Sequence, residues 1–129
     1  MPNSYHVLIA GAGPAGAMLA WKLARQGLKV LIIDRARLPR YKTCGGGLTA
    51  RAKGLIPFDI SPVMEVEART AVVAVDYRPV FQAQTDQPLV YTVMRDRFDY
   101  FLVQQAVKAG AELIDQTAFR SVDGPPGNL

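Results

Sequence analysis

Residues 6–34 read HVLIAGAGPAGAMLAWKLARQGLKVLIID, and this stretch decides the fold. It opens with the apolar run 6–10, which predicts a strand buried on both faces. Helix-forming residues occupy 14–26, with a proline in the first turn and Gly27 just past the end. The run 29–33 is a second buried strand. The stretch therefore predicts a βαβ unit that crosses over right-handed into a parallel sheet.

The middle of the chain predicts a loop and then a group of antiparallel strands. Residues 34–53 hold six Lys or Arg and three consecutive glycines. A long glycine-rich loop in a compact domain is usually functional. Residues 63–93 alternate apolar and polar side chains, which indicates three or four short strands. We therefore interpret 62–93 as an antiparallel insertion.

The last third returns to helix and parallel strand. A helix is expected from Arg95, with Asp96 as its N-cap and Gly110 as its terminator. Residues 112–114 predict a third parallel strand, 118–122 a further strand and 123–129 a turn. The predicted fold class is α/β, a Rossmann-like parallel sheet with a small antiparallel group. Because a doubly wound sheet usually has more strands, residues 1–129 are expected to be the truncated N-terminal part of one domain.

Composition and charge limit the ligand classes. The chain has 129 residues, 50% hydrophobic residues and one cysteine, which excludes disorder and an internal disulfide framework and indicates a reducing, cytoplasmic setting. Residues 1–21 are uncharged, but glycines and a proline interrupt them, so no span of a bilayer is expected. Residues 1–58 carry nine Lys or Arg and one acid, a charge of +8 that favours an anion. No nucleic-acid motif is readable, which favours a small phosphorylated ligand over nucleic acid.

The glycines between the first predicted strand and helix form a dinucleotide-binding pattern. Gly11, Gly13 and Gly16 make GxGxxG. The first glycine permits a tight turn, the second lets a pyrophosphate approach the backbone, and the third packs the helix on the strand. Asp34 ends the second strand, where a carboxylate accepts hydrogen bonds from a ribose and repels a 2′-phosphate. The pattern predicts FAD or NAD rather than NADP, and the alternative is a plain glycine-rich turn with an exposed aspartate.

The loop after Asp34 separates these two cofactors. A plain NAD domain leads quickly into another helix, whereas here a basic, glycine-rich loop intervenes at 35–48. Its side chains can neutralise a pyrophosphate, and its glycines can lie against a flat ring. The loop therefore favours FAD over NAD.

Three segments together resemble a known family. RARLPRYKTCGGGL (35–48), VMRDRFDYFL (93–102) and AVKAGAEL (106–113) follow GAGPAG and the terminal aspartate. This chain resembles the geranylgeranyl reductase family of flavoproteins, within the p-hydroxybenzoate hydroxylase superfamily. GAGPAG is common among flavoproteins, whereas the PxxxxCGGGL form at 39–48 is much more specific. The resemblance spans nearly the whole chain.

The resemblance implies a set of FAD-binding residues. Asp34 would hold the adenosine ribose, Arg35 would flank the adenine, and Arg95 would contact the cofactor from the start of its helix. The pyrophosphate would lie against the glycine-rich turn, and the flavin against the CGGGL run. The residues implied at these two places are Gly11, Gly13, Pro14, Ala15 and Gly16, and Cys44, Gly45 and Gly47.

The resemblance also implies an activity. Reduced flavin, recharged by NADPH or another donor, would saturate isoprenoid double bonds of a prenyl lipid, a diphosphate, or a chlorophyll or quinone precursor. Such a substrate makes peripheral membrane association of the parent protein an expectation. A second FAD motif, a GD pair, and a lipid-binding half are expected after position 129. The 129 residues alone are therefore not expected to be catalytically competent.

Several alternatives stay open at this stage. Cys44 is a candidate redox or proton-relay residue, or a small packing residue. Arg97 is an alternative to Arg95. Asp96 and Asp99 are interpreted as a helix cap and a first-turn acid, and no metal site is expected. The alternative functions are a flavin-dependent aromatic monooxygenase and a non-catalytic nucleotide-binding module.

Overall fold

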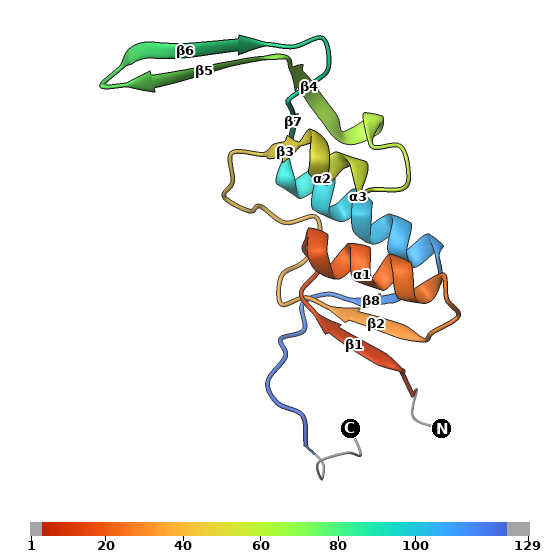
Figure 1. Cartoon of the computed structure of the whole chain (residues 1–129). Helices are drawn as coiled ribbons and strands as arrows, with labels where there is room; N and C mark the ends of the chain where they lie inside the picture. The colour runs from red at the N-terminus through yellow and green to blue at the C-terminus, as the bar shows by residue number, and fades with distance from the viewer. Residues whose placement is uncertain (1–3, 124–129) are drawn as a thin grey trace. The chain divides into compact units, whose positions relative to one another are not determined.

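A computed structural model describes residues 4–123 of the chain (Figure 1). The chain divides into two compact units, one made of residues up to Arg40 together with those from Asp99 onward, and the other of Tyr41–Phe98. The elements of the first unit are β1 (Val7–Ala10), α1 (Pro14–Ala24), β2 (Val30–Ile33), most of α3 (Arg95–Lys108) and β8 (Glu112–Ile114). Those of the second are β3 (Gly47–Thr49), α2 (Ala50–Gly54), a 3-10 turn (Ser61–Val63), β4 (Met64–Ala68), β5 (Thr70–Val75), β6 (Arg78–Gln84) and β7 (Val90–Val93).

A parallel sheet forms the base of the first unit, as predicted. Its strand order is β1-β2-β8, with Val7 opposite Val30 and Ile32 opposite Leu113. Both crossovers advance in the same direction across the sheet, so right-handed connections place α1 and α3 on the same face (Figure 1). The predicted βαβ unit and the predicted third parallel strand are confirmed.

The two strands of the βαβ unit differ in burial. All four residues of β2 are buried, as expected for the central strand, and α1 packs its buried Ala17 and Ala20 toward the sheet. The expectation that the first strand is buried on both faces is wrong, because Leu8 of β1 is 47% exposed. Among the described residues β1 pairs with β2 alone, which makes β1 an edge strand.

Helix α3 begins one residue earlier than its predicted cap. The helix starts at Arg95, and Met94 accepts a hydrogen bond from the amide of Phe98. Asp96 is therefore an acid inside the first turn rather than the N-cap, a position where it still opposes the positive helix end. The apolar stripe of α3 includes Phe98 and Leu102, which are 3% and 1% exposed.

Residues 63–93 in the second unit form four antiparallel strands, within the predicted three or four. The order in its larger sheet is β3-β7-β4, and β5 pairs with β6 in a hairpin. The two turn residues of this hairpin, Asp76 and Tyr77, have φ angles of 48° and 62°. Two consecutive positive φ angles match the type I′ turn, whose twist suits a two-residue hairpin.

Two segments differ from the predicted loop and strand. Residues 47–54 are not loop: they form β3, which pairs with β7, and α2, where the Thr49 hydroxyl caps the amide of Ala52 at 3.2 Å. Residues 118–122 do not form the expected strand. Gln116, before this segment, takes a left-handed conformation (φ 54°), and the amide of Thr117 donates to the carbonyl of Asp34 at 2.8 Å. The turn expected at 123–129 lies, from residue 124, outside the described residues.

No helix within residues 4–123 has both the length and the hydropathy needed to cross a bilayer.

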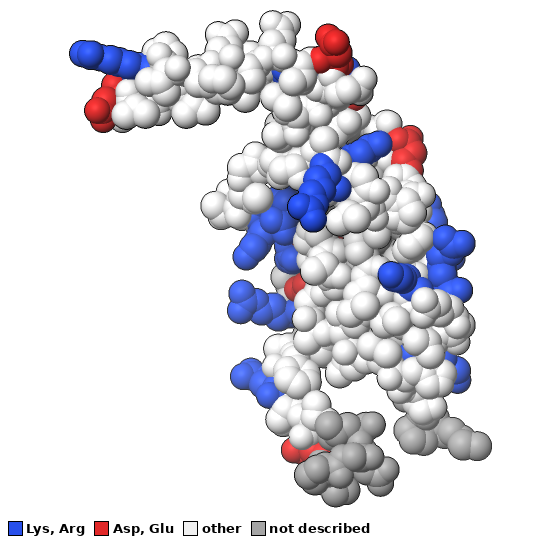
Figure 2. Space-filling model, viewed as in Figure 1, with Lys and Arg blue, Asp and Glu red and all other residues white. Residues whose placement is uncertain are grey.

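Basic side chains outnumber acidic ones on the visible surface (Figure 2). This distribution agrees with the positive charge of residues 1–58.

Candidate dinucleotide-binding site

The glycine-rich turn joins β1 to α1 and is fixed to the end of β2. The amide of Gly11 donates to the carbonyl of Ile33 at 2.7 Å. Gly11 has a φ of 113°, in the region that glycine adopts far more readily than other residues. Gly11 therefore allows a tight turn from the end of β1 into the start of α1.

Gly16 and Gly13 perform different tasks. A Cβ on Gly16 would lie 2.1 Å from the carbonyl oxygen of Gly11 and 3.1 Å from Cγ2 of Ile9, so its hydrogen lets α1 approach β1. A Cβ on Gly13 would meet only a side-chain nitrogen of Arg40, at 3.7 Å, and one on Gly11 would meet nothing within 4 Å. The turn is therefore closed on the packing side and open at its first two glycines. Open glycine backbone of this kind fits the approach of a pyrophosphate.

The first turn of α1 is free of acidic side chains. Gly13 is the N-cap and makes no side-chain cap, and Pro14 is the first helical residue. The next amides, those of Ala15 and Gly16, have no acceptor in the preceding turn by the geometry of a helix start. These N–H groups and the helix dipole favour an anion at this end.

Asp34 connects the end of β2 to the glycine-rich turn. Its Oδ2 accepts the amide of Ala12 at 2.8 Å and its Oδ1 accepts the amide of Ala36 at 2.9 Å, while the side chain is 7% exposed. Burial by itself raises the pKa of Asp34, but the two amides and the Arg40 guanidinium lower the pKa more, so it lies below its ordinary value. Asp34 is therefore a stable carboxylate beside the turn, where the sequence predicted a ribose acceptor.

Arg40 and Asp99 join this cluster, and sequence reasoning missed their pairing. Nη1 of Arg40 lies 3.2 Å from Oδ2 of Asp99, and Nε of Arg40 lies 3.6 Å from Oδ2 of Asp34. Asp96, and not Asp99, is the acid in the first turn of α3, so the interpretation of Asp99 as a first-turn acid is wrong, and Asp99 is instead 1% exposed. The sequence does contain a sign of this burial. Asp99 precedes the buried Leu102 by three residues, and residues three apart lie on the same face of a helix.

The CGGGL run belongs to the second unit. Cys44 is exposed, and its Sγ accepts the amide of Gly46 at 3.4 Å. Gly46 has a φ of 70°, and a Cβ there would lie 2.2 Å from the carbonyl oxygen of Val93. Gly45 is open, whereas Gly47 pairs with β7. The fold thus requires glycine at Gly46, the member of the run that was not among the predicted site residues.

The predicted arginines occupy different surroundings. Arg97 forms an ion pair with Glu65 of β4, within the second unit. Arg95 is the first residue of α3 and is half-buried. Arg35 follows Asp34 directly and is exposed. Arg95 stays the predicted candidate for ligand contact, with Arg97 as its alternative.

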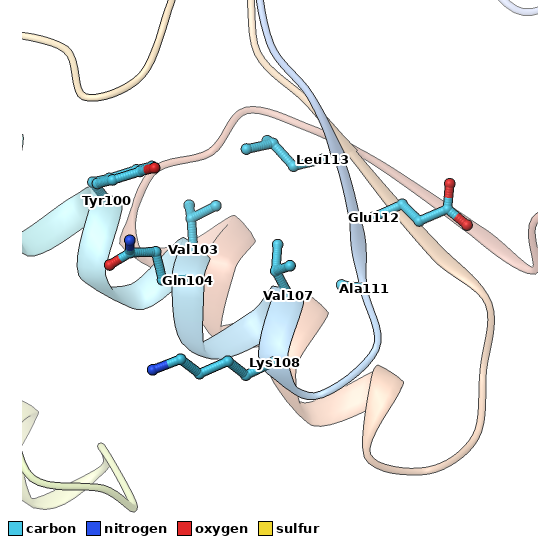
Figure 3. A pocket seen from close by; sticks show the side chains of 8 residues that line it. All are labelled: Tyr100, Val103, Gln104, Val107, Lys108, Ala111, Glu112 and Leu113. Carbon is cyan, nitrogen blue, oxygen red and sulfur yellow. The ribbon is translucent and has the colours of Figure 1, made fainter.

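A separate cavity of about 590 Å³ lies in the first unit between α3 and β8 (Figure 3). Apolar side chains such as Val103, Val107 and Leu113 line it, with Lys108 and Glu112 at its polar part. None of the residues that the sequence predicted to hold a dinucleotide lines this cavity. The predicted dinucleotide-binding residues and this cavity therefore lie at different places in the unit.

Comparison with known proteins decides the family. Residues 4–125 match the model of a family described as "FAD binding domain". The chain belongs to this FAD binding domain family. It is 36% identical over 117 residues to the geranylgeranyl diphosphate reductase of Rhodobacter capsulatus, covering 90% of this chain and 29% of that protein. The chain thus spans less than a third of that relative.

Solved structures of the family agree with this assignment. A geranylgeranyl bacteriochlorophyll reductase-like protein from Thermoplasma acidophilum superposes with a TM-score of 0.84 and 28% identity, over 95% of this chain and 32% of that one. The halogenase PltM superposes with a TM-score of 0.73 and 26% identity, over 94% of this chain and 30% of that one. The resemblance to geranylgeranyl reductases is confirmed, and this family fold also occurs in a halogenase. The open turn at Gly11 and Gly13 and the carboxylate of Asp34 fit the dinucleotide that the family description names.

Proposed function

We propose that this chain binds FAD and forms the nucleotide-binding part of a reductase that saturates isoprenoid carbon–carbon double bonds. The observation that carries the proposal is the glycine-rich turn, open at Gly11 and Gly13 and tied through Ala12 to the buried carboxylate of Asp34. The similarity to a geranylgeranyl diphosphate reductase supports the substrate class. Residues 1–129 are proposed as the N-terminal part of the FAD-binding domain, with 62–93 as its antiparallel insertion.

The first unit supplies the groups that would hold the nucleotide half of the cofactor. The amides of Ala15 and Gly16 and the positive end of α1 face the pyrophosphate position and lower the cost of placing negative charge there. Asp34 keeps its charge because its pKa lies below the ordinary value, and its oxygens retain lone pairs for the ribose hydroxyls. The same charge repels a 2′-phosphate, so FAD or NAD is preferred to NADP at this site.

The residues proposed for the flavin belong to the CGGGL run and to the start of α3. The backbone at Gly45 is open, and Cys44 and Gly47 are exposed. We propose that these three residues lie along the flavin and that Arg95 contacts the cofactor from the start of α3. Cys44 is a candidate proton-relay residue, because its exposed thiol follows a basic stretch that favours the thiolate.

The reaction itself depends on the flavin and on an electron donor. Bound and reduced, FAD would supply the hydride for a double bond whose other carbon takes a proton, while the protein would supply binding, orientation and electrostatics. We propose NADPH as the donor and a prenyl lipid, diphosphate, or chlorophyll or quinone precursor as the substrate. A prenyl-lipid substrate would bring the protein to a membrane surface, so peripheral membrane association is part of the proposal.

A binding titration tests the cofactor assignment. Calorimetry of the 129-residue chain with FAD, NAD and NADP should give saturable binding that is tightest for FAD and weakest for NADP. Asp34→Ala should weaken FAD binding, because the ribose hydroxyls lose an ionised acceptor. Tighter binding of NAD than of FAD would reject the FAD assignment.

A flavin-dependent monooxygenase or halogenase is the second candidate, and the similarity to the halogenase PltM favours it. The two candidates differ in what the reduced flavin reacts with. The protein that contains this chain, loaded with FAD and reduced without oxygen, should return to the oxidised spectrum on addition of a geranylgeranyl substrate. Reoxidation that requires oxygen and ignores the isoprenoid would favour the second candidate.

A further inference from the structure

Arg40 is held in place by two buried carboxylates. Its Nη1 lies 3.2 Å from Oδ2 of Asp99, and its Nε lies 3.6 Å from Oδ2 of Asp34. The two carboxylates are 1% and 7% exposed, and the arginine side chain is 17% exposed. Removing such carboxylates from water is costly unless a cation compensates them. The two ion pairs, with Asp34 and with Asp99, therefore hold the Arg40 guanidinium in one orientation.

The third nitrogen of this guanidinium faces the glycine-rich turn. Nη2 of Arg40 is the nearest atom to the point where a Cβ on Gly13 would lie, at 3.7 Å. Gly13 is the glycine whose open backbone fits the approach of a pyrophosphate. The structure thus places two N–H donors of a fixed cation at the edge of that space.

The turn has no cation of its own. Residues 1–21 carry no Lys or Arg, so amides and the helix dipole are the local attraction for a doubly charged pyrophosphate. The carboxylate of Asp34, needed for the ribose, repels that pyrophosphate. A guanidinium has five N–H donors in a planar fork and can serve carboxylates and a phosphate oxygen at once, which a lysine ammonium does less well.

We propose that Arg40 is a binding residue for the pyrophosphate of the dinucleotide and that Asp99 is the positioning residue that aims it. This inference rests on the proposed dinucleotide site and adds to it a contact from the loop after β2. It also accounts for a buried aspartate on α3 that the packing of an apolar stripe does not require.

The test separates phosphate recognition from a structural role by using two probes, ADP and adenosine. Calorimetry of the 129-residue chain should show that Arg40→Gln weakens ADP binding by about tenfold or more, since a charge-assisted hydrogen bond is lost. Adenosine binding should change by less than about threefold. The dependence of ADP affinity on salt should also become shallower, because one cation is missing. Arg37→Gln, which removes an exposed charge from the same loop, is the matched control and should leave both affinities unchanged.

Arg40→Gln leaves two buried carboxylates without their cation, so a second variant guards against misfolding. Arg40→Gln combined with Asp99→Asn removes one of those charges and should reproduce the selective loss of ADP affinity in a chain with a wild-type circular dichroism spectrum. Equal weakening of ADP and adenosine, or unchanged ADP binding in a folded variant that still binds FAD, would overturn the role of Arg40 alone. A wild-type chain that binds neither FAD nor ADP would reject the proposed function and this inference together.

Discussion

Replacing Gly16 by alanine tests whether the closeness of α1 to β1 holds the first unit together. The added Cβ would lie 2.1 Å from the carbonyl oxygen of Gly11, and a separation below 3.0 Å is essentially never seen for a real Cβ. The helix start must therefore move by about 0.9 Å or more from the strand, and backbone on both sides resists this shift. The same movement loosens the contacts of Ala17 and Ala20, both 0% exposed.

The expected cost follows from overpacking. Inserting one methyl group into a closed site costs roughly 1–3 kcal/mol, and a clash with a carbonyl group belongs at the upper end of that range. In a cooperative unit of under 100 residues each kcal/mol lowers the Tm by about 4–8 °C, so we expect a fall of about 10 °C or more. Thermal unfolding followed by circular dichroism measures it.

A second glycine provides the control. Gly54 ends α2, and a Cβ there would meet nothing within 4 Å, so Gly54→Ala should leave the Tm equal or slightly higher. If Gly16→Ala unfolds within about 2 °C of the wild type, the close approach of helix and strand does not limit stability and the reasoning is refuted.

Three further outcomes are expected. Gly46→Ala should lower the Tm by several degrees, because its Cβ would lie 2.2 Å from the carbonyl oxygen of Val93 and its φ is positive; an unchanged melting curve would contradict this. Gly13→Asn keeps a favourable N-cap but fills the open turn, so calorimetry should show FAD binding weakened by about tenfold or more with a smaller change in Tm than Gly16→Ala. The pKa of Asp34 is lower in the folded chain than in the unfolded chain, so its charge stabilises the fold above the unfolded pKa of about 3.9. This contribution is lost as the pH falls through the folded pKa. Asp34→Asn should therefore make the free energy of unfolding, measured by urea titration, fall less steeply below about pH 4.

The sequence predicted the elements whose causes are local. Apolar runs and glycine positions predicted the βαβ unit, and the alternation at 63–93 predicted three or four short antiparallel strands, of which the structure contains four. The errors arose where an outcome depends on distant partners. The burial of β1 depends on the number of neighbouring strands, and the strand β3 exists because β7 offers it a hydrogen-bonding edge.

The candidate site divides in the same way. The glycine pattern and Asp34 are local signals, because a strand–turn–helix connection places them side by side whatever the rest of the chain does. The pairing of Arg40 with Asp99 joins residues 59 positions apart, and no spacing rule connects them. Gly46 was passed over because three consecutive glycines look alike in a sequence, and only the position of the Val93 carbonyl distinguishes them.

The sequence by itself determined the parallel βαβ unit, the open glycine-rich turn and the carboxylate at its end. These follow from side-chain size, backbone freedom and hydrophobic periodicity over fewer than 35 residues. Only the tertiary structure showed that Arg40 is the cation paired with the buried carboxylates, and that Gly46 is the glycine of the CGGGL run where a side chain would not fit. Ion pairs and close backbone contacts join atoms that the folded chain brings together. The separation of two residues in the sequence does not indicate how far apart they lie in the fold.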